Sequence, residues 1–219
     1  KIAEQLSAAG KSAEAAAVLL SVAQSSKDES FQQRALFEAA TQLQKSADLM
    51  AAARTYEQVA LTYPNSELSD AALYQAGSVR EALGDWSLAA ADYLKLFESY
   101  PESKLREQSL KNASLCYENA ADWLAAKNTC RRYLETYPDR SVQVVEFTFK
   151  VGDMAYKANQ ISEAKSWYEE TVRTYHRFLI AGESVDNYFV AQAQFMIGEI
   201  LFAEYTQLNL TPPFDVNLQ

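Results

Sequence analysis

The residue types that most often carry catalysis or bind metals are scarce in this chain. It has a single histidine, His176, and two cysteines, Cys116 and Cys130, separated by 13 residues. A catalytic imidazole needs a third group to orient it, and nothing in the sequence marks His176 for that role, so we expect a surface or helix-terminal histidine. A closed zinc site cannot be assembled from so few ligands, and no glycine-rich phosphate loop occurs. We therefore expect no catalytic residue, no metal, no cofactor and no enzymatic activity.

The two cysteines have two possible roles. In an oxidising compartment they could form a disulfide. Free cysteine also behaves as a small hydrophobic residue, and we favour the second role, that of two buried thiols.

Composition narrows the fold class and the partners. The 219 residues include only 6 Gly and 5 Pro but 35 Ala, and Ala is the best helix former. These counts favour an all-α chain. The net charge of −9 argues against nucleic acid, whose phosphates need a basic surface. The longest apolar runs fall well short of the roughly 20 residues of a membrane helix, so we expect no direct membrane insertion.

An internal repeat organises the chain. Tyr-Pro occurs at Tyr63, Tyr100 and Tyr137, each time 37 residues apart. Three tripeptides, which begin at Ala47, Gly84 and Ala121, recur with the same period of 37 residues. An alanine lies five residues after the first residue of each tripeptide. Extrapolation reaches Gly10 on one side and, with one inserted residue, Asn159 on the other. Such a period is typical of stacked supersecondary units.

Each repeat contains two helices by its apolar spacing. An aspartate after each turn residue (Asp48, Asp85 and Asp122) can cap the second helix, and the proline after Tyr stops that helix. Ser66 and Ser103 are predicted N-caps of the next first helix. We expect small residues on the first helices to meet alanines on the second helices, with large tyrosines packed alongside. The small residues are Gly77, Ser114 and Gly152, the alanines are Ala89, Ala126 and Ala164, and the tyrosines are Tyr56, Tyr93 and Tyr168.

The order of a small residue, a Gly-Asp-aromatic turn, an alanine, an aromatic residue and Tyr-Pro resembles the tetratricopeptide repeat over about residues 3–176. The resemblance implies an α-solenoid, a right-handed superhelix of stacked antiparallel helix pairs. The period of 37 rather than 34 and the Tyr-Pro-x-Ser linker resemble bacterial cell-envelope members, of the outer-membrane assembly lipoprotein and Tol–Pal coordinator types. A periplasmic or cell-envelope location is therefore expected over a cytoplasmic one. Arg80 replaces a usual apolar residue, so its guanidinium should reach for a carboxylate.

The expected organisation is one solenoid over residues 1–207, followed by an extended tail over 208–219. The repeats should span about 1–26, 30–63, 67–99, 104–136 and 141–181, with a final helix over 185–207 after the capping candidate Ser184. Because the chain starts with Lys1, we expect it to be an excised or processed piece of a longer protein.

The final helix is apolar around most of its circumference, whereas a terminal cap should be polar outside. Either another repeat or a partner subunit covers it, or it wedges into the groove of its own solenoid. Homo-oligomerisation or further repeats through this helix are thus possible.

The resemblance also implies a concave groove lined by the first helices, in which a protein or peptide binds. The positions that match the family's groove are Arg34, Phe37, Gln44, Tyr74, Ser78, Glu81, Lys111, Glu118, Glu146, Phe149, Asp153 and Tyr156. Aromatics mixed with both charges suit a peptide surface. The alternative is that the aromatic members pack between adjacent repeats.

The leading functional hypothesis is a non-enzymatic protein–protein interaction module or scaffold. A self-assembling structural scaffold of the cell envelope and an accessory domain of a larger enzyme are the alternatives.

Overall fold

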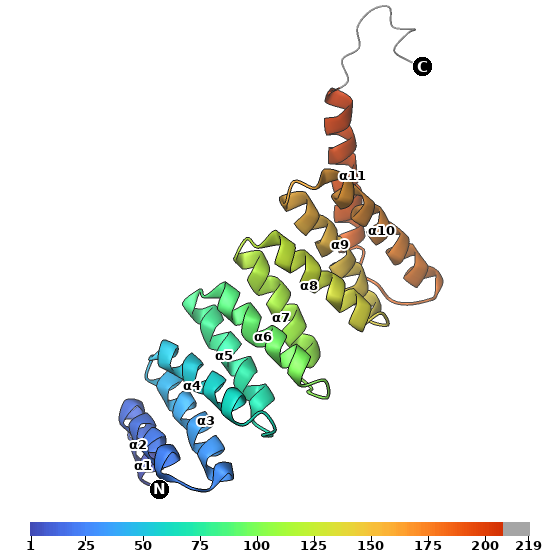
Figure 1. The fold of residues 1–219 in the computed structure, drawn as a ribbon. Coiled ribbons are helices and arrows are strands. Elements are labelled where there is room, and N and C mark those ends of the chain that lie inside the picture. Colours follow the sequence, from blue (N-terminus) through green and yellow to red (C-terminus); the bar gives the residue numbers. More distant parts are fainter. Residues whose placement is uncertain (208–219) are drawn as a thin grey trace, which may run out of the picture. The chain divides into compact units, whose positions relative to one another are not determined.

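The computed structural model describes residues 1–207, and these residues fold into helices joined by short turns (Figure 1). The predicted tail over 208–219 lies outside the described residues. The helices are α1 (Ile2–Ala8), α2 (Ser12–Ser25), α3 (Glu29–Lys45), α4 (Leu49–Thr62), α5 (Ser69–Leu83), α6 (Trp86–Ser99), α7 (Arg106–Asn119), α8 (Trp123–Thr136), α9 (Ser141–Lys157), α10 (Ile161–Ile180) and α11 (Tyr188–Thr206). No strand occurs among the described residues, which confirms the all-α prediction.

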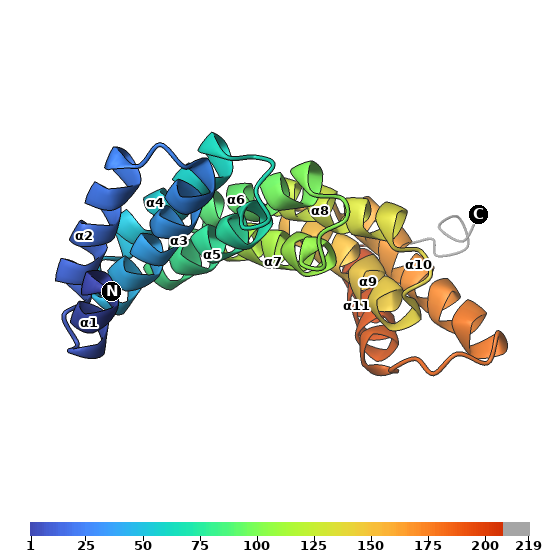
Figure 2. The same ribbon diagram turned by 90° about the horizontal axis from the view of Figure 1, so that it is seen from below.

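The helices form two compact units, one over Lys1–Asp122 and one from Trp123 onward. In the N-terminal unit each helix from α1 to α7 packs on the next, and in the C-terminal unit α8 to α11 do the same. Figure 2 shows α3, α5 and α7 in one row, with α4 and α6 in a second row beside them. Within each unit this is the consecutive stacking of antiparallel helix pairs that the repeat predicts.

The turn between the two helices of a repeat always has the same backbone conformation. One residue, the first or second after the first helix, has a positive φ in each repeat, with values of 76°, 64°, 77°, 55° and 59° at Gly10, Ala47, Gly84, Ala121 and Asn159. These are the five positions that the repeat period predicts, including both extrapolated ones. A left-handed residue at this place lets the next amides bond back to the last turn of the helix, so the period marks a helix stop.

Of the predicted aspartate caps, Asp48 makes its capping bond and Asp85 does not. Asp48 accepts a hydrogen bond from the Ala51 amide at 3.2 Å, as expected. Asp85 holds the N-cap position of α6, but its side chain makes no capping bond. The predicted capping bond of Asp85 is therefore wrong, although its place at the N-cap is right, because the position in the sequence does not determine the side-chain rotamer.

The prediction that Ser66 and Ser103 are N-caps is wrong, because α5 and α7 begin later and their N-cap residues are Leu68 and Leu105. The serine hydroxyl oxygens accept from the amides of Leu68 and Leu105, at 3.2 and 3.1 Å, before α5 and α7 begin. Each hydroxyl also donates to the first helix of the preceding repeat, Ser66 to Gln33 Oε1 and Ser103 to Asp70 Oδ2, both at 2.6 Å. The serines thus tie neighbouring repeats together with the 37-residue period.

The small residues on the first helices make room for tyrosine rings. A Cβ added at Gly77 would lie 2.8 Å from Tyr93 Cζ, and one at Gly152 would lie 2.9 Å from Tyr168 Cδ1. The nearest atoms belong to the tyrosines and not to the alanines that the sequence suggested as partners. Each ring is fully buried, so it packs directly on the helix backbone.

The helix predicted over 185–207 begins later, at Tyr188. Asp186, not the predicted Ser184, accepts the hydrogen bond from the Tyr188 amide, at 2.9 Å. No helix within residues 1–207 has both the length and the hydropathy to cross a membrane.

Candidate functional site

The twelve predicted groove residues all keep part of their surface exposed. Arg34, Gln44 and Tyr156 are exposed and the other nine are half-buried. Residues one or two positions away on the same helices, such as Leu110 and Val151, are fully buried. The spacing of three, four or seven residues within each helix places the members on one side of it. We call these sets the first-helix stripes.

In the N-terminal unit the stripes lie on α3, α5 and α7. Phe37 packs edge-on against Tyr56, with ring centroids 5.2 Å apart, and Tyr74 against Tyr93 at 5.4 Å. Each pair joins the two helices of one repeat. Tyr74 also packs against hydrophobic clusters that contain Ala60 of the preceding repeat and Ala113 of the following one, so packing between adjacent repeats, the alternative that the sequence offered, occurs as well.

Hydrogen bonds connect the stripes of α5 and α7. The Asn112 amide donates to the Tyr74 hydroxyl at 3.3 Å, and the Cys116 thiol donates to Glu81 Oε1 at 3.1 Å. Burial, with the Glu81 carboxylate beside it, raises the pKa of Cys116 well above its ordinary value, so this thiol stays protonated. Cys116 and Cys130 are both free and buried, which agrees with the buried-thiol interpretation.

Apart from Glu81, which accepts from Cys116 of the next repeat, several charged and polar members of the N-terminal stripes bond within their own helix or repeat. Arg34 Nε donates to the Ser30 carbonyl at 3.1 Å, and Lys111 lies 2.8 Å from Glu107 one turn earlier. Gln44 Oε1 lies 3.5 Å from the Tyr56 hydroxyl. Arg34 and Gln44 are exposed, so these two side chains can reach a ligand in solvent.

In the C-terminal unit the stripe on α9 holds four of the predicted residues. Glu146 and Asp153 pair with lysines one turn later, at 3.6 Å to Lys150 and 2.9 Å to Lys157. Phe149 packs on Tyr168, with centroids 5.5 Å apart, and also touches Phe189 at 5.7 Å.

Tyr156 is different from the other aromatic members, because 39% of its surface is exposed. It is the one aromatic member of the predicted set that the structure leaves exposed rather than half-buried.

The densest charge cluster is structural and lies away from the stripes. Arg80 is buried and donates to Glu57 on α4 and to Asp92 on α6, with one contact to Glu57 Oε1 at 3.0 Å. The prediction that Arg80 reaches for a carboxylate is confirmed. Burial, together with the nearby Glu57 carboxylate, raises the pKa of Asp92 to about 7 against the opposing effect of Arg80.

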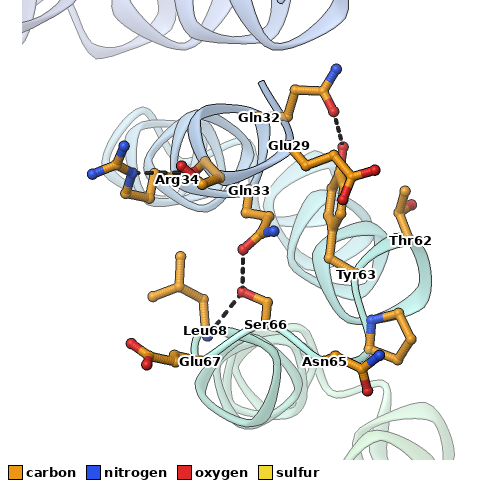
Figure 3. A pocket seen from close by; sticks show the side chains of 12 residues that line it. Glu29, Gln32, Gln33, Arg34, Thr62, Tyr63, Asn65, Ser66, Glu67 and Leu68 are labelled. Atoms are coloured by element: carbon orange, nitrogen blue, oxygen red, sulfur yellow. Dashed lines mark hydrogen bonds between the residues drawn. The ribbon is translucent and has the colours of Figure 1, made fainter. Parts of the chain in front are cut away.

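A hollow of about 750 Å³ lies where the N-terminal part of α3 faces the linker between α4 and α5 (Figure 3). In this view Gln32 bonds the Tyr63 hydroxyl at 2.7 Å, and Gln33 accepts from Ser66. The wall is formed by polar side chains and a few apolar ones, from Glu29, Ser30, Gln32, Gln33, Arg34, Thr62, Tyr63, Pro64, Asn65, Ser66, Glu67 and Leu68.

The sequence predicted only Arg34 among these residues as part of a site. The Tyr-Pro-x-Ser linker marks the repeat in the sequence, and its recurrence is the one sequence feature that could have pointed to the hollow. Its existence depends on how the linker folds against α3, which the linker pattern does not specify.

His176 is exposed and packs edge-on against Tyr175, with ring centroids 5.5 Å apart. This position fits the surface histidine that we expected. Within residues 1–207 no group of three or more His, Cys, Asp or Glu side chains could hold a metal ion.

Comparison with known proteins identifies the repeat. A family model for the tetratricopeptide repeat matches residues 34–66, 71–103 and 112–140. In these three segments the chain is similar to tetratricopeptide repeats. The structure places helix pairs of the same kind before and after them. No curated protein sequence gives a significant match.

Solved structures of other proteins have similar folds. A kinesin light chain of Podosopora anserina with nearly identical TPR-like repeats matches at 13% identity and a TM-score of 0.50, covering 80% of this chain and 92% of that chain. A tetratricopeptide repeat protein from Parabacteroides merdae matches at 16% identity and 0.49, covering 95% and 78%. MamA from Desulfovibrio magneticus matches at 16% identity and 0.46, covering 80% and 92%. At such identities the likeness concerns the fold alone.

Proposed function

We propose that this chain is a non-catalytic interaction module that binds a segment of a partner protein along the first-helix stripes. The observation that carries the proposal is that all twelve stripe residues keep part of their surface exposed while residues one or two positions away are buried. Tetratricopeptide repeats generally act as protein-interaction scaffolds, and the stripes offer what a peptide needs. They combine carboxylates, cations and one exposed tyrosine, and aromatic and arginine side chains dominate binding energy at interfaces.

The stripe residues do not contribute equally to this surface. Phe37, Tyr74 and Phe149 already pack on tyrosines of their own or neighbouring helices. Their truncation would disturb folding as well as binding. Tyr156 and Arg34 are exposed and make few contacts, so they report on binding alone.

A random peptide library provides a test that does not require the natural partner. Peptides selected on the intact chain should lose at least about tenfold in affinity with Tyr156→Ala or Arg34→Glu, since a hot-spot side chain contributes 2 kcal/mol or more. Tyr175→Ala on the second helix α10 is the matched control and should leave affinity unchanged. Binding that survives both stripe variants would overturn the proposal.

We further propose a bacterial cell-envelope location. It is supported by the 37-residue period and the Tyr-Pro-x-Ser linkers at Tyr63 and Tyr100, which resemble envelope members. Fractionation of the source cell with an antibody to the chain tests it, and recovery in the cytoplasmic fraction would contradict it.

A further inference from the structure

Helix α11 has two apolar faces, and only one of them is covered. Its inner face packs on α9 and α10 through Ala193, Met196, Ile197 and Ile200, which join Tyr168 in one hydrophobic cluster. The opposite face carries large apolar side chains in solvent. In Figure 1 the C-terminal turns of α11 project beyond α9 and α10.

The inner face has the register of a first helix. In α5, Ala72, Ala76 and Val79 pack on the preceding repeat, and they lie five residues before, one before and two after Gly77. In α11, Ala193, Ile197 and Ile200 have the same offsets from Gly198 and pack in the same way. Gly198 therefore corresponds to Gly77 and Gly152, and α11 is the first helix of a sixth repeat.

The outer face shows what that register leaves uncovered. An aromatic residue stands three positions before each glycine: Tyr74, Phe149 and Phe195. In α5 and α9 a tyrosine from the second helix covers the glycine and contacts this aromatic ring. In α11 no atom lies within 4 Å of the place of a Cβ on Gly198, and 61% of the surface of Phe195 is exposed.

We call this uncovered face the outer stripe of α11. All its members are exposed and none is charged: Tyr188, Ala191, Gln194, Phe195, Gly198, Leu201, Phe202 and Tyr205. Phe202 and Tyr205 expose 65% and 66% of their surface. A mostly apolar exposed face of this length marks an interaction site.

We propose that the outer stripe binds the outer stripe of a second copy of this chain, with the two α11 helices antiparallel. The order of large and small residues along the stripe is self-complementary. When the two-fold axis passes between residues 196 and 197, each Phe195 ring lies over Gly198 of the second copy. Phe202 then lies over Ala191, and Tyr205 meets Tyr188.

This pairing repeats a packing that the chain already uses. A ring lies on a glycine backbone at Tyr93 over Gly77 and at Tyr168 over Gly152. Small residues at the crossing let two helices approach closely, and two-fold symmetry is the commonest arrangement of homo-oligomers.

The charges fit the same pairing. The same axis places Glu199 opposite Gln194, so no carboxylates face each other across the stripe. The two chains repel at long range because each carries a net charge of −9. Added salt should therefore strengthen the association.

Sedimentation equilibrium of the whole chain tests the proposal. We expect a mass that rises with concentration toward twice the chain mass of 24.5 kDa. Phe202→Glu should give a monomer with unchanged helicity by circular dichroism. Leu124→Glu on α8 is the control, because Leu124 is 60% exposed but lies off the outer stripe, and it should leave the dimer intact.

Gly198→Phe separates specific pairing from general stickiness. It adds apolar surface but fills the place of the Phe195 ring, so the proposal predicts a monomer. A monomeric wild type, or a Gly198→Phe variant that associates as tightly as the wild type, would overturn the proposal. Such a result would favour a different protein as the occupant of the stripe. The peptide-binding variants Tyr156→Ala and Arg34→Glu should not affect this equilibrium.

Discussion

Replacing Ala47 with glycine should stabilise the N-terminal unit, although glycine usually weakens helical proteins. Ala47 is exposed and has a φ of 64°, in the left-handed region that costs a residue with a Cβ roughly 1–2 kcal/mol. The bonds of the turn do not involve its side chain, because the Ala47 amide donates to the Gln44 carbonyl at 3.1 Å and the Asp48 amide to the Leu43 carbonyl at 3.0 Å. Gly84 occupies the equivalent place one repeat later with a φ of 77°.

The expected gain in stability is smaller than the strain that is relieved. Glycine also increases the conformational entropy of the unfolded chain, which favours unfolding by about 0.4–1 kcal/mol. The free energy of unfolding should rise by about 0.5–1 kcal/mol, measured by urea denaturation with circular dichroism. Ala91→Gly is the matched control. Ala91 is exposed in the middle of α6, so the same substitution there should cost about 1 kcal/mol. If both variants shifted stability in the same direction, the assignment of a left-handed turn at Ala47 would be wrong.

Three further predictions concern the interior. Gly152→Ala should lower the free energy of unfolding by about 1–2 kcal/mol, because its Cβ would lie 2.9 Å from buried Tyr168; an unchanged denaturation midpoint would contradict this packing. Tyr168→Phe should leave the free energy of unfolding unchanged or raise it by up to about 1 kcal/mol in the same assay, because the buried hydroxyl has no hydrogen-bond partner among the described residues. Tyr56→Phe should instead lower the free energy of unfolding, because it breaks the 2.9 Å bond between the Tyr56 hydroxyl and Thr41. Asp92 binds its proton more tightly when the chain is folded, with a pKa raised from 3.8 to about 7, so its contribution to stability should fall as pH rises between these values. The free energy of unfolding of Asp92→Asn should therefore decline less with pH over that range than that of the wild type, and an equal decline would refute the shift.

Local features of the fold, such as the turns within the repeats, could be predicted from the sequence because the same residue pattern recurs in each repeat. The turn residues recur with one period, and the structure gives a positive φ at all five. The ion pair of Arg80 was predictable as well, since a guanidinium inside a packed helix pair needs a carboxylate. Both inferences depend on residue type and place alone.

Features that depend on side-chain orientation could not be predicted in this way. The sequence places Asp85 at a cap, but not its rotamer, and the capping bond does not form. The same pattern does not reveal that the rings of Phe37 and Tyr74 turn toward tyrosines within their own repeats. The first-helix stripes were therefore located by register, while the share of each side chain left for a partner needed the structure.

The register of α11 could in principle have been found in the sequence. Gly198 follows Phe195 by three residues, as Gly77 follows Tyr74. The longer connection between α10 and α11 breaks the period, so extrapolation by 37 residues does not reach α11. The match emerges only when the buried residues of α5 and α11 are compared.

Site-specific photo-crosslinking tests the central claim, that partners bind along the first-helix stripes, most directly. A photoreactive phenylalanine placed at Ser78 on α5 or Tyr156 on α9 should crosslink to a peptide selected on the intact chain. The same group at exposed Leu88 on α6 or Leu124 on α8 should not. Crosslinks from α6 and α8 without any from α5 and α9 would contradict the account, because the bound segment would then lie on the second helices.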